Sequence, residues 1–258
     1  MSGSETTDLA GKLAAQSAAP RMKRFYTAAS AAPTAEGGFR IELDGRPVRT
    51  PGRRIVQVPV RALAEEMAAE WAGQGEFIDP LTMPVTRLVN SALDGVEPNR
   101  AAVAAEIVRY AGSDLLCYRT EGPAALVELQ SQIWDPLLDW AREEIGATFF
   151  LSEGVVYVEQ PRRSLEAIAA HLPEDALRLA ALNLLTTLSG SALVALALWG
   201  GRLAPEEAWR AAHIDEEVQE KAWGTDAEAT ARRAARFRDF AAAALCLELI
   251  EQAERLSS

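Results

Sequence analysis

The fold predicted for this chain depends on residues 179–201. They read Leu-Ala-Ala-Leu-Asn-Leu-Leu-Thr-Thr-Leu-Ser-Gly-Ser-Ala-Leu-Val-Ala-Leu-Ala-Leu-Trp-Gly-Gly, with no charge between Arg178 and Arg202. A run of this length can in principle span a bilayer. Its hydroxyl and amide side chains dilute the apolarity, however, and no basic loop flanks it as a membrane span requires. At its centre, Gly190 weakens a helix and Ser191 favours a new N-cap. We therefore predict two helices, or one kinked helix, buried in a helical bundle, and no membrane insertion.

The rest of the composition is that of an ordinary globular protein. Hydrophobic residues make up 49% and charged residues 24% of 258 residues, which suits one large or two modest domains. The net charge of −11 disfavours nucleic acid as a partner. Residues 20–61 carry a net charge of +6 and residues 62–258 carry −16. This imbalance is either chance or the mark of a protein that meets its partner through an acidic surface.

The cysteines and the N-terminus bear on the compartment. Cys117 and Cys246 form no CxxC pair and predict no disulfide framework, which fits a reducing compartment. The N-terminus lacks the apolar segment of a secretory signal, and Glu5 and Asp8 argue against a mitochondrial transit peptide. Residues 1–22 are rich in small and polar side chains and are expected to form a disordered tail.

Residues 23–80 are predicted to form a small α+β domain. Alternating apolar and polar side chains indicate strands over residues 24–28, 39–43, 47–50 and 54–58, with turns at Asp44-Gly45 and Pro51-Gly52. A helix is expected to begin at Pro59 and to end at Gly73 or Gly75. This helix would cover the apolar face of the antiparallel sheet.

Residues 81–258 follow a helical period almost throughout. Helices are expected over residues 82–94, with Thr82 as cap, 99–112, 126–146, 163–171, 205–223 and 227–256, and a helix beginning at Pro173 runs into the apolar stretch. A brief pairing of residues 149–151 with 155–158 is the one exception. The predicted fold class is therefore α+β: a small N-terminal antiparallel sheet plus helix layer, followed by a larger all-α orthogonal helical bundle.

Motifs for catalysis are missing from the sequence. It contains no phosphate-binding glycine loop, no HExxH and no GxSxG. His171 and His213 are the only histidines, and neither lies within a few residues of a cysteine. Cys117 is most simply a buried apolar side chain. We therefore expect no catalytic residues, no metal site and no cofactor.

One helix face is unusual. In the helix expected over residues 205–223, small and apolar side chains form one stripe. On nearly the opposite face, Trp209, His213, Glu216, Glu220 and Trp223 follow at spacings of four, three, four and three. Either the tryptophans pack on another helix, or they frame a binding face together with the carboxylates. The candidate partner-binding residues are Glu216, Glu217, Glu220, Trp209 and Trp223.

Four segments together resemble the ATP12 family, the assembly chaperones for the F1 sector of ATP synthase. The resemblance covers nearly all of residues 24–250. The segments are residues 24–26 with 43–51; Glu70-Trp71 through residues 78–84; residues 110–119; and residues 215–219 with Trp223-Gly224. Each segment alone is weak, but their order and spacing are specific.

The resemblance implies a function as well as a fold. It implies that the chain is no enzyme and binds the free F1 α subunit before it pairs with β. The family's important acidic position falls in residues 215–219, on either Glu216 or Glu217. The short N-terminus implies a bacterial cytoplasmic protein, or a mitochondrial matrix protein if the source is eukaryotic, and a monomer is expected. The alternative is a small hydrolase that uses carboxylates near Trp209 and Trp223.

Overall fold

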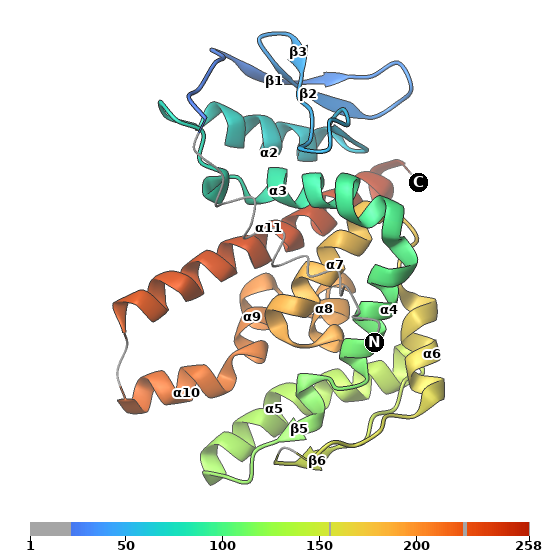
Figure 1. Cartoon of the computed structure of the whole chain (residues 1–258). Coiled ribbons are helices and arrows are strands. Elements are labelled where there is room, and N and C mark those ends of the chain that lie inside the picture. The colour runs from blue at the N-terminus through green and yellow to red at the C-terminus, as the bar shows by residue number, and fades with distance from the viewer. Residues whose placement is uncertain (1–21, 155, 224–225, 258) are drawn as a thin grey trace, which may run out of the picture. The chain divides into compact units, whose positions relative to one another are not determined.

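The computed structural model describes residues 22–154, 156–223 and 226–257, without the side chains of residues 219–223 and 257. A small sheet comes first along the described chain (Figure 1). Apart from Met22, the tail predicted over residues 1–22 lies outside the described residues. The described chain groups into two units. The first contains residues up to Arg100 with 174–181 and 242–258, and the second contains residues 101–173 and 182–241. Residues 81–100 thus group with the sheet, whereas the sequence predicts a domain boundary after residue 80.

The antiparallel sheet of the first unit is centred on β2 (Phe39–Leu43). β2 pairs with β1 (Ala29–Pro33), β3 (Arg46–Pro47) and β4 (Gln57–Val58), with Ala31 opposite Ile41. The first strand was predicted over residues 24–28, and that placement is wrong. Side chains occupy the backbone groups there: the Asp44 carboxylate accepts the N–H groups of Thr27 and Ala28. Those residues are therefore held as a loop, and pairing begins at Ala29.

Helix α2 (Arg61–Ala72) covers the apolar face of the sheet, as the sequence predicts. The sheet buries Ile41 and Leu43, and the helix buries Leu63 and Met67, each no more than 6% exposed. Gly73 is the C-cap residue. Figure 1 shows α2 lying beneath the strands.

Helix α3 (Pro84–Ser91) follows a single 3-10 turn at Pro80–Thr82. Its first N–H groups are capped from α2, because the Glu70 carboxylate accepts hydrogen bonds from Val85 and Thr86, both at 2.8 Å. The expectation that Thr82 caps this helix is wrong. Glu70 already supplies both acceptors, and the Thr82 hydroxyl donates to the Asp79 carbonyl instead. A π-helical turn (Ala92–Val96), a 3-10 turn (Glu97–Asn99) and α4 (Arg100–Ala111) continue the chain.

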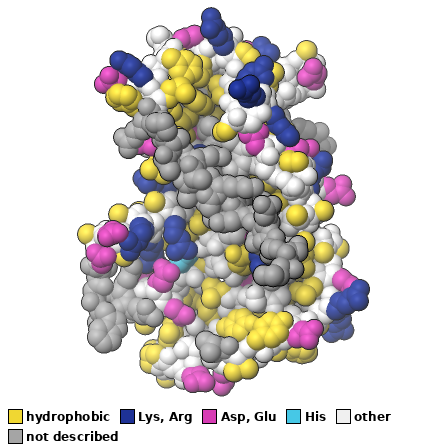
Figure 2. Space-filling model, viewed as in Figure 1, with side chains coloured by type: hydrophobic (Ala, Val, Ile, Leu, Met, Phe, Trp, Pro, Cys, Tyr) yellow, Lys and Arg dark blue, Asp and Glu magenta, His cyan; other side chains and the backbone are white. Residues whose placement is uncertain are grey.

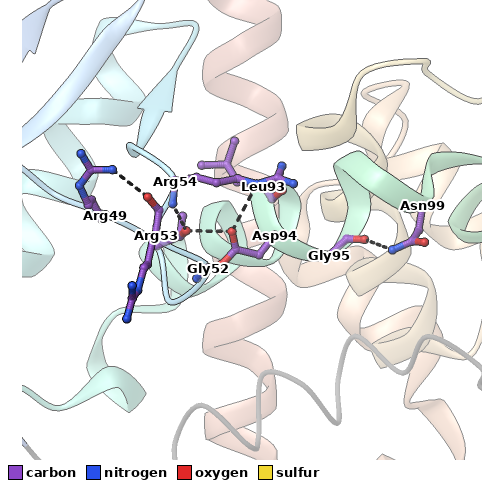
Figure 3. Close-up of polar contacts among 9 residues, drawn as sticks. Arg49, Gly52, Arg53, Arg54, Leu93, Asp94, Gly95 and Asn99 are labelled. Carbon is purple, nitrogen blue, oxygen red and sulfur yellow. Dashed lines mark hydrogen bonds and ion pairs between the residues drawn. The ribbon is translucent and has the colours of Figure 1, made fainter.

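Asp94, in the π-helical turn, forms hydrogen bonds with the turn around Gly52 (Figure 3). Its carboxylate accepts hydrogen bonds from the Thr50 hydroxyl at 2.8 Å and from the Gly52 N–H at 2.7 Å. Arg54 donates to the Leu93 carbonyl at 2.5 Å and strengthens the same junction. A Cβ atom on Gly52 would lie 2.6 Å from an Asp94 carboxylate oxygen, which is closer than nonbonded atoms approach. Space beside the Asp94 carboxylate, rather than backbone conformation, therefore favours glycine here.

Replacing Gly52 by Ala is expected to destabilise the protein by about 1 kcal/mol, because the Asp94 carboxylate has to move and its hydrogen bonds from the Thr50 hydroxyl and the Gly52 N–H are weakened. Urea denaturation of the purified variant measures this cost. Gly75→Ala is the matched control, since a Cβ atom there meets nothing within 4 Å. Equal midpoints for the two variants would show that the Asp94 junction tolerates the movement.

The second unit is built from helices. They are α4 from Ala101 onward, α5 (Ala124–Trp140) with a π-helical turn (Ala141–Ile145), α6 (Arg162–His171), α8 (Ala192–Trp199), α9 (Pro205–Ala212) and α10 (Ile214–Trp223), with parts of α7 (Ala176–Ser189) and α11 (Ala227–Ser257). The chain is thus a small antiparallel sheet with its helix, followed by a mostly helical region, as the predicted fold class states.

The apolar stretch forms two helices, which confirms that prediction. Helix α7 ends at Ser189, Gly190 adopts φ +70°, and the Ser191 hydroxyl caps α8 by accepting the Val194 N–H. All residues from Ala192 to Leu198 are buried. Within the part of the chain that the structure describes, no helix combines the length and apolarity needed to cross a membrane.

A two-stranded sheet replaces the hairpin predicted over residues 149–158. β6 (Ser152–Glu153) pairs in parallel with β5 (Tyr118–Arg119), so its partner is distant in sequence. The predicted pairing of residues 149–151 with 155–158 is wrong for the described residues, and Val155 itself lies outside them. The Gln160 side chain bonds both backbone groups of Phe150 and so occupies the positions that a strand would use.

Candidate partner-binding site

The candidate site begins where α9 ends at Ala212. The single helix predicted over residues 205–223 is two helices, because His213 between them adopts φ −125°. In a continuous helix the Trp209 carbonyl would accept the His213 N–H. Instead the His213 ring Nδ1–H donates to that carbonyl at 2.8 Å, and the His213 N–H bonds the Arg210 carbonyl. The imidazole therefore takes the place of the helical hydrogen bond and redirects the chain.

Trp209 belongs to the core of the second unit. Only 7% of it is exposed, its ring stacks on His213 at 3.8 Å, and the rings of Phe237 and Phe240 meet it edge-on. The Arg236 guanidinium lies 5.7 Å from its centroid. Of the two interpretations that the spacing leaves open, Trp209 follows the first, packing on α11, and it is not exposed as the candidate partner-binding role would need. The break at His213 changes which side chains share a face, so a spacing argument across residue 213 fails.

His213 is held in its neutral form. It is 4% exposed, and burial lowers its pKa below the usual value, with the positive charges of Arg236 and Arg233 acting in the same direction. The hydrogen bond to the Trp209 carbonyl and the charge of Glu216 oppose this shift. The Nε2 atom lies 3.5 Å from the Arg236 guanidinium. His213 thus has a structural role at the break between α9 and α10.

Three consecutive carboxylates form the first turn of α10, where the helix dipole favours negative charge. Asp215 accepts a hydrogen bond from Gln130 of α5 at 3.0 Å. Glu217 is 29% exposed and pairs with Arg210 of α9 at 3.3 Å. The Glu216 side chain is exposed and, among the described residues, makes no hydrogen bond or ion pair, although its charge acts on His213. The carboxylates on either side are engaged, and Glu216 is the most exposed of the three.

The remaining predicted site residues, Glu220 and Trp223, lie on α10, and their side chains are outside the described residues. The stripe of small and apolar side chains predicted on the opposite face is buried over its first three residues. Ala208, Ala211 and Ile214 are each no more than 1% exposed. The sequence thus finds the buried stripe and the acidic turn, but it does not bring Trp209 to the same surface.

A groove of about 830 Å³ in the first unit is a further candidate surface, and it lies on the basic meander between Arg40 and Arg61, the second choice for a binding face from the sequence. Its apolar walls include Phe25, Tyr26, Val48 and Ile78. Arg46 and Arg49 also line it, in keeping with the net positive charge of residues 20–61. Figure 2 shows hydrophobic side chains over α2 and the sheet with Lys and Arg beside them. The excess of arginine in this segment was the available signal.

Groups for catalysis or metal binding are not assembled in the residues that the structure describes. No cluster of three or more His, Cys, Asp or Glu side chains that could hold a metal occurs among them. Cys117 and Cys246 are free and buried, and burial raises the pKa of each thiol to about 12. Both are protonated near neutral pH and unreactive.

Comparisons with known proteins agree with a binding role. A family model described as the ATP12 chaperone protein matches residues 23–142. Atp12 from Paracoccus denitrificans is 40% identical, with a TM-score of 0.80 over 88% of this chain and 97% of that chain. A solved protein from Agrobacterium tumefaciens is 44% identical, with a TM-score of 0.85 over 94% of this chain and 96% of that chain. The mitochondrial protein atp12 of Schizosaccharomyces pombe is 26% identical over 219 residues, which are 80% of this chain and 75% of that protein.

The matching family model and the solved relatives define the class of this protein, a chaperone that assists assembly. The chain belongs to the ATP12 chaperone family, whose members assist the assembly of ATP synthase and are not enzymes. This membership excludes the alternative of a carboxylate hydrolase near Trp209 and Trp223. It agrees with the burial of Trp209, which leaves that residue unavailable to a substrate.

Proposed function

We propose that this chaperone binds the free F1 α subunit and shields its exposed subunit interface from aggregation until the β subunit pairs with it. An unassembled subunit exposes an apolar surface meant for its partner, and such surfaces aggregate. A holding chaperone covers that surface reversibly and needs no catalytic group. Its affinity is moderate, because the true partner has to displace it.

The observation that carries the proposal is the state of the three carboxylates that open α10. Asp215 and Glu217 are committed to Gln130 and Arg210, so they fix the turn. Glu216 is exposed beside them and is free to meet an Arg or Lys of the α subunit. Of the two acidic residues that the family resemblance leaves open, the geometry favours Glu216 for contact and Glu217 for support. Glu220 and Trp223, further along α10, belong to the same proposed surface.

The proposed setting follows from the relatives. Both solved relatives are bacterial and are 40–44% identical, so we place this protein in a bacterial cytoplasm. The fission yeast relative is named as mitochondrial, and a eukaryotic source would imply the matrix. We propose that the chaperone acts as a monomer without nucleic acid, since its net charge of −11 opposes binding to phosphate backbones.

Glu216→Lys is expected to abolish protection of the F1 α subunit while leaving the fold intact. A charge change at an exposed position alters stability by less than about 0.5 kcal/mol. Losing a desolvated charge pair costs binding ~2–5 kcal/mol, and a like charge opposite Arg or Lys costs more. The measurement is light scattering of purified α subunit, with circular dichroism and thermal melting of the variant. Glu217→Lys is tested separately, because it also breaks the pair with Arg210.

Glu36→Lys is the matched control, because Glu36 is exposed on the turn between β1 and β2 of the first unit. This substitution changes the net charge by the same amount as Glu216→Lys. It is expected to protect the α subunit as well as the unaltered chaperone does. If Glu216→Lys and Glu217→Lys both protect fully, the binding face is not on α10. The groove lined by Arg46 and Arg49 is then the next surface to reverse in charge.

A further inference from the structure

Four large apolar side chains lie on the surface of the second unit within eight residues. Phe150 and Leu151 are 54% and 51% exposed, and Val156 and Tyr157 are 69% and 68% exposed. They belong to the loop of residues 148–160, called here the apolar loop, of which Val155 is not described. In Figure 2 hydrophobic side chains gather at the bottom of the view, where α5, β5 and β6 lie in Figure 1. Contiguous exposed apolar surface of this kind marks sites of interaction.

Buried polar side chains hold the apolar loop in place. Gln160 is 4% exposed; its side-chain oxygen accepts the Phe150 N–H at 2.8 Å and its amide donates to the Phe150 carbonyl at 2.9 Å. Ser164 is fully buried and makes the same pair of contacts with Thr148. The Gly154 N–H bonds the Arg119 carbonyl beside the β5–β6 pairing. Backbone groups of Thr148 and Phe150 thus have hydrogen-bond partners in buried side chains, whereas the four apolar side chains are exposed to solvent.

Within the apolar loop itself the charge is negative, whereas the exposed Arg162 and Arg163 follow it directly, with Arg162 paired to Glu166 at 2.7 Å. Residues 148–160 contain two Glu and no Lys or Arg, and both Glu153 and Glu159 are exposed. Glu121 adds a third carboxylate, because one of its oxygens lies 3.5 Å from where a Cβ atom on Gly154 would be. The nearby Arg119 is only 11% exposed and is paired with Asp135 at 2.7 Å. A partner that fits here carries apolar side chains bordered by Lys or Arg.

The apolar loop is connected to the acidic turn of α10 within the same unit. Gln130 accepts the Thr120 N–H, next to β5, and donates to Asp215 at the start of α10. A hollow of about 590 Å³ is lined by Gln130 together with Val127, Leu151 and Glu153. One side chain therefore positions both surfaces, and both bear exposed carboxylates.

We propose that the apolar loop is a second contact surface for the client of this chaperone, and that it covers an apolar patch bordered by basic side chains. The inference rests on the proposed function, since the client is taken to be the F1 α subunit. Glu216 then supplies charge recognition, and the apolar loop supplies the shielding of apolar surface. Because Trp209 is buried, the α10 site lacks that aromatic contact. The apolar loop then supplies the surface that covers the aggregation-prone patch.

Site-specific photocrosslinking distinguishes the loop from the α10 site. A benzoylphenylalanine side chain is placed at position 157, 216 or 256 in the full chain, and each product is irradiated with purified F1 α subunit. Leu256 is the control, since it is an apolar residue 90% exposed in the first unit. Crosslinks from 157 and 216 and none from 256 are expected. A crosslink from 216 without one from 157 overturns the loop proposal alone, and none from either position overturns the proposed function as well.

The double variant Phe150→Ser/Tyr157→Ser measures the contribution of the loop. At least tenfold weaker binding of the α subunit is expected, with an unchanged melting temperature, because both side chains are exposed. Leu256→Ser is expected to bind normally. Glu153→Lys/Glu159→Lys is expected to weaken binding at low salt more than at high salt. Unchanged binding by the Phe150 and Tyr157 variant contradicts the proposal.

Two other occupants of the loop give different results. If a second copy of this chain covers it, sedimentation shows a dimer for the unaltered protein and a monomer for the double variant. If a membrane covers it, vesicles of phosphatidylcholine and cardiolipin bind the unaltered protein and not the double variant. Either result overturns the client proposal.

Discussion

Leu196→Asp is expected to yield no folded protein. Leu196 is fully buried in α8, whose residues from Ala192 to Leu198 are all buried. The substitution removes a packed side chain, which alone costs about 2–5 kcal/mol, and buries a carboxylate without a partner, which costs several more. Domains are stable by only about 5–15 kcal/mol, so the sum removes most or all of the margin. Expression in the insoluble fraction and loss of near-ultraviolet circular dichroism are the expected observations.

The control for this experiment is the same substitution at an exposed leucine. Leu256 is 90% exposed near the end of α11, and Leu256→Asp is expected to change stability by less than about 0.5 kcal/mol. A soluble Leu196→Asp variant with unaltered melting would show that α8 is not the core of a bundle. Recovery of the unaltered chain in membranes after alkaline washing would contradict the buried-core interpretation as well.

Asp114→Ala is expected to be the second most damaging change, because Asp114 joins the start of α8 to the 3-10 turn at Leu115–Cys117. Its fully buried carboxylate accepts hydrogen bonds from the Ser191 hydroxyl at 2.6 Å and from the Leu193 and Leu116 N–H groups, both at 3.1 Å. Each buried donor left without an acceptor costs about 1–3 kcal/mol. Urea denaturation should therefore show a loss of more than about 3 kcal/mol. Asp139→Ala, at a side chain 57% exposed, should show almost none.

The same residue predicts a pH dependence. Burial raises the pKa of Asp114 to about 6, although the hydrogen bonds from Ser191 and the backbone oppose the shift. The folded state therefore retains a proton that the unfolded state has lost between about pH 4 and pH 6, so this contribution to stability falls as pH rises through that range. The destabilisation caused by Asp114→Ala is expected to be larger at pH 4 than at pH 7, by up to about 3 kcal/mol.

Urea titrations of both proteins at several pH values test this, and the difference between them isolates Asp114. Other groups drop out of that difference, including His213, whose lowered pKa acts in the opposite direction. A destabilisation that is independent of pH would show that Asp114 titrates alike in the folded and unfolded chains.

Features governed by neighbouring residues were predicted from the sequence alone. The uncharged run with Ser189-Gly190-Ser191 at its centre determined two buried helices. Gly190 adopts a positive φ, and the Ser191 hydroxyl accepts the Val194 N–H at the start of the second helix. Alternation determined β2, and Gly73 ended α2. The three consecutive acidic residues that open α10 also lie outside the core, since such a run at a first turn is rarely buried.

Only the tertiary structure decided the features that depend on distant partners. The His213 ring displaced a helical hydrogen bond because Trp209 is packed by Phe237 and Phe240, so no local pattern predicted the break. The space for a side chain at Gly52 is taken by Asp94, which lies 42 residues further along the chain. Gln160 held Phe150 out of a hairpin and left it exposed. The sequence therefore determined which segments are helical and acidic, whereas long-range contacts decided which side chains reach the surface.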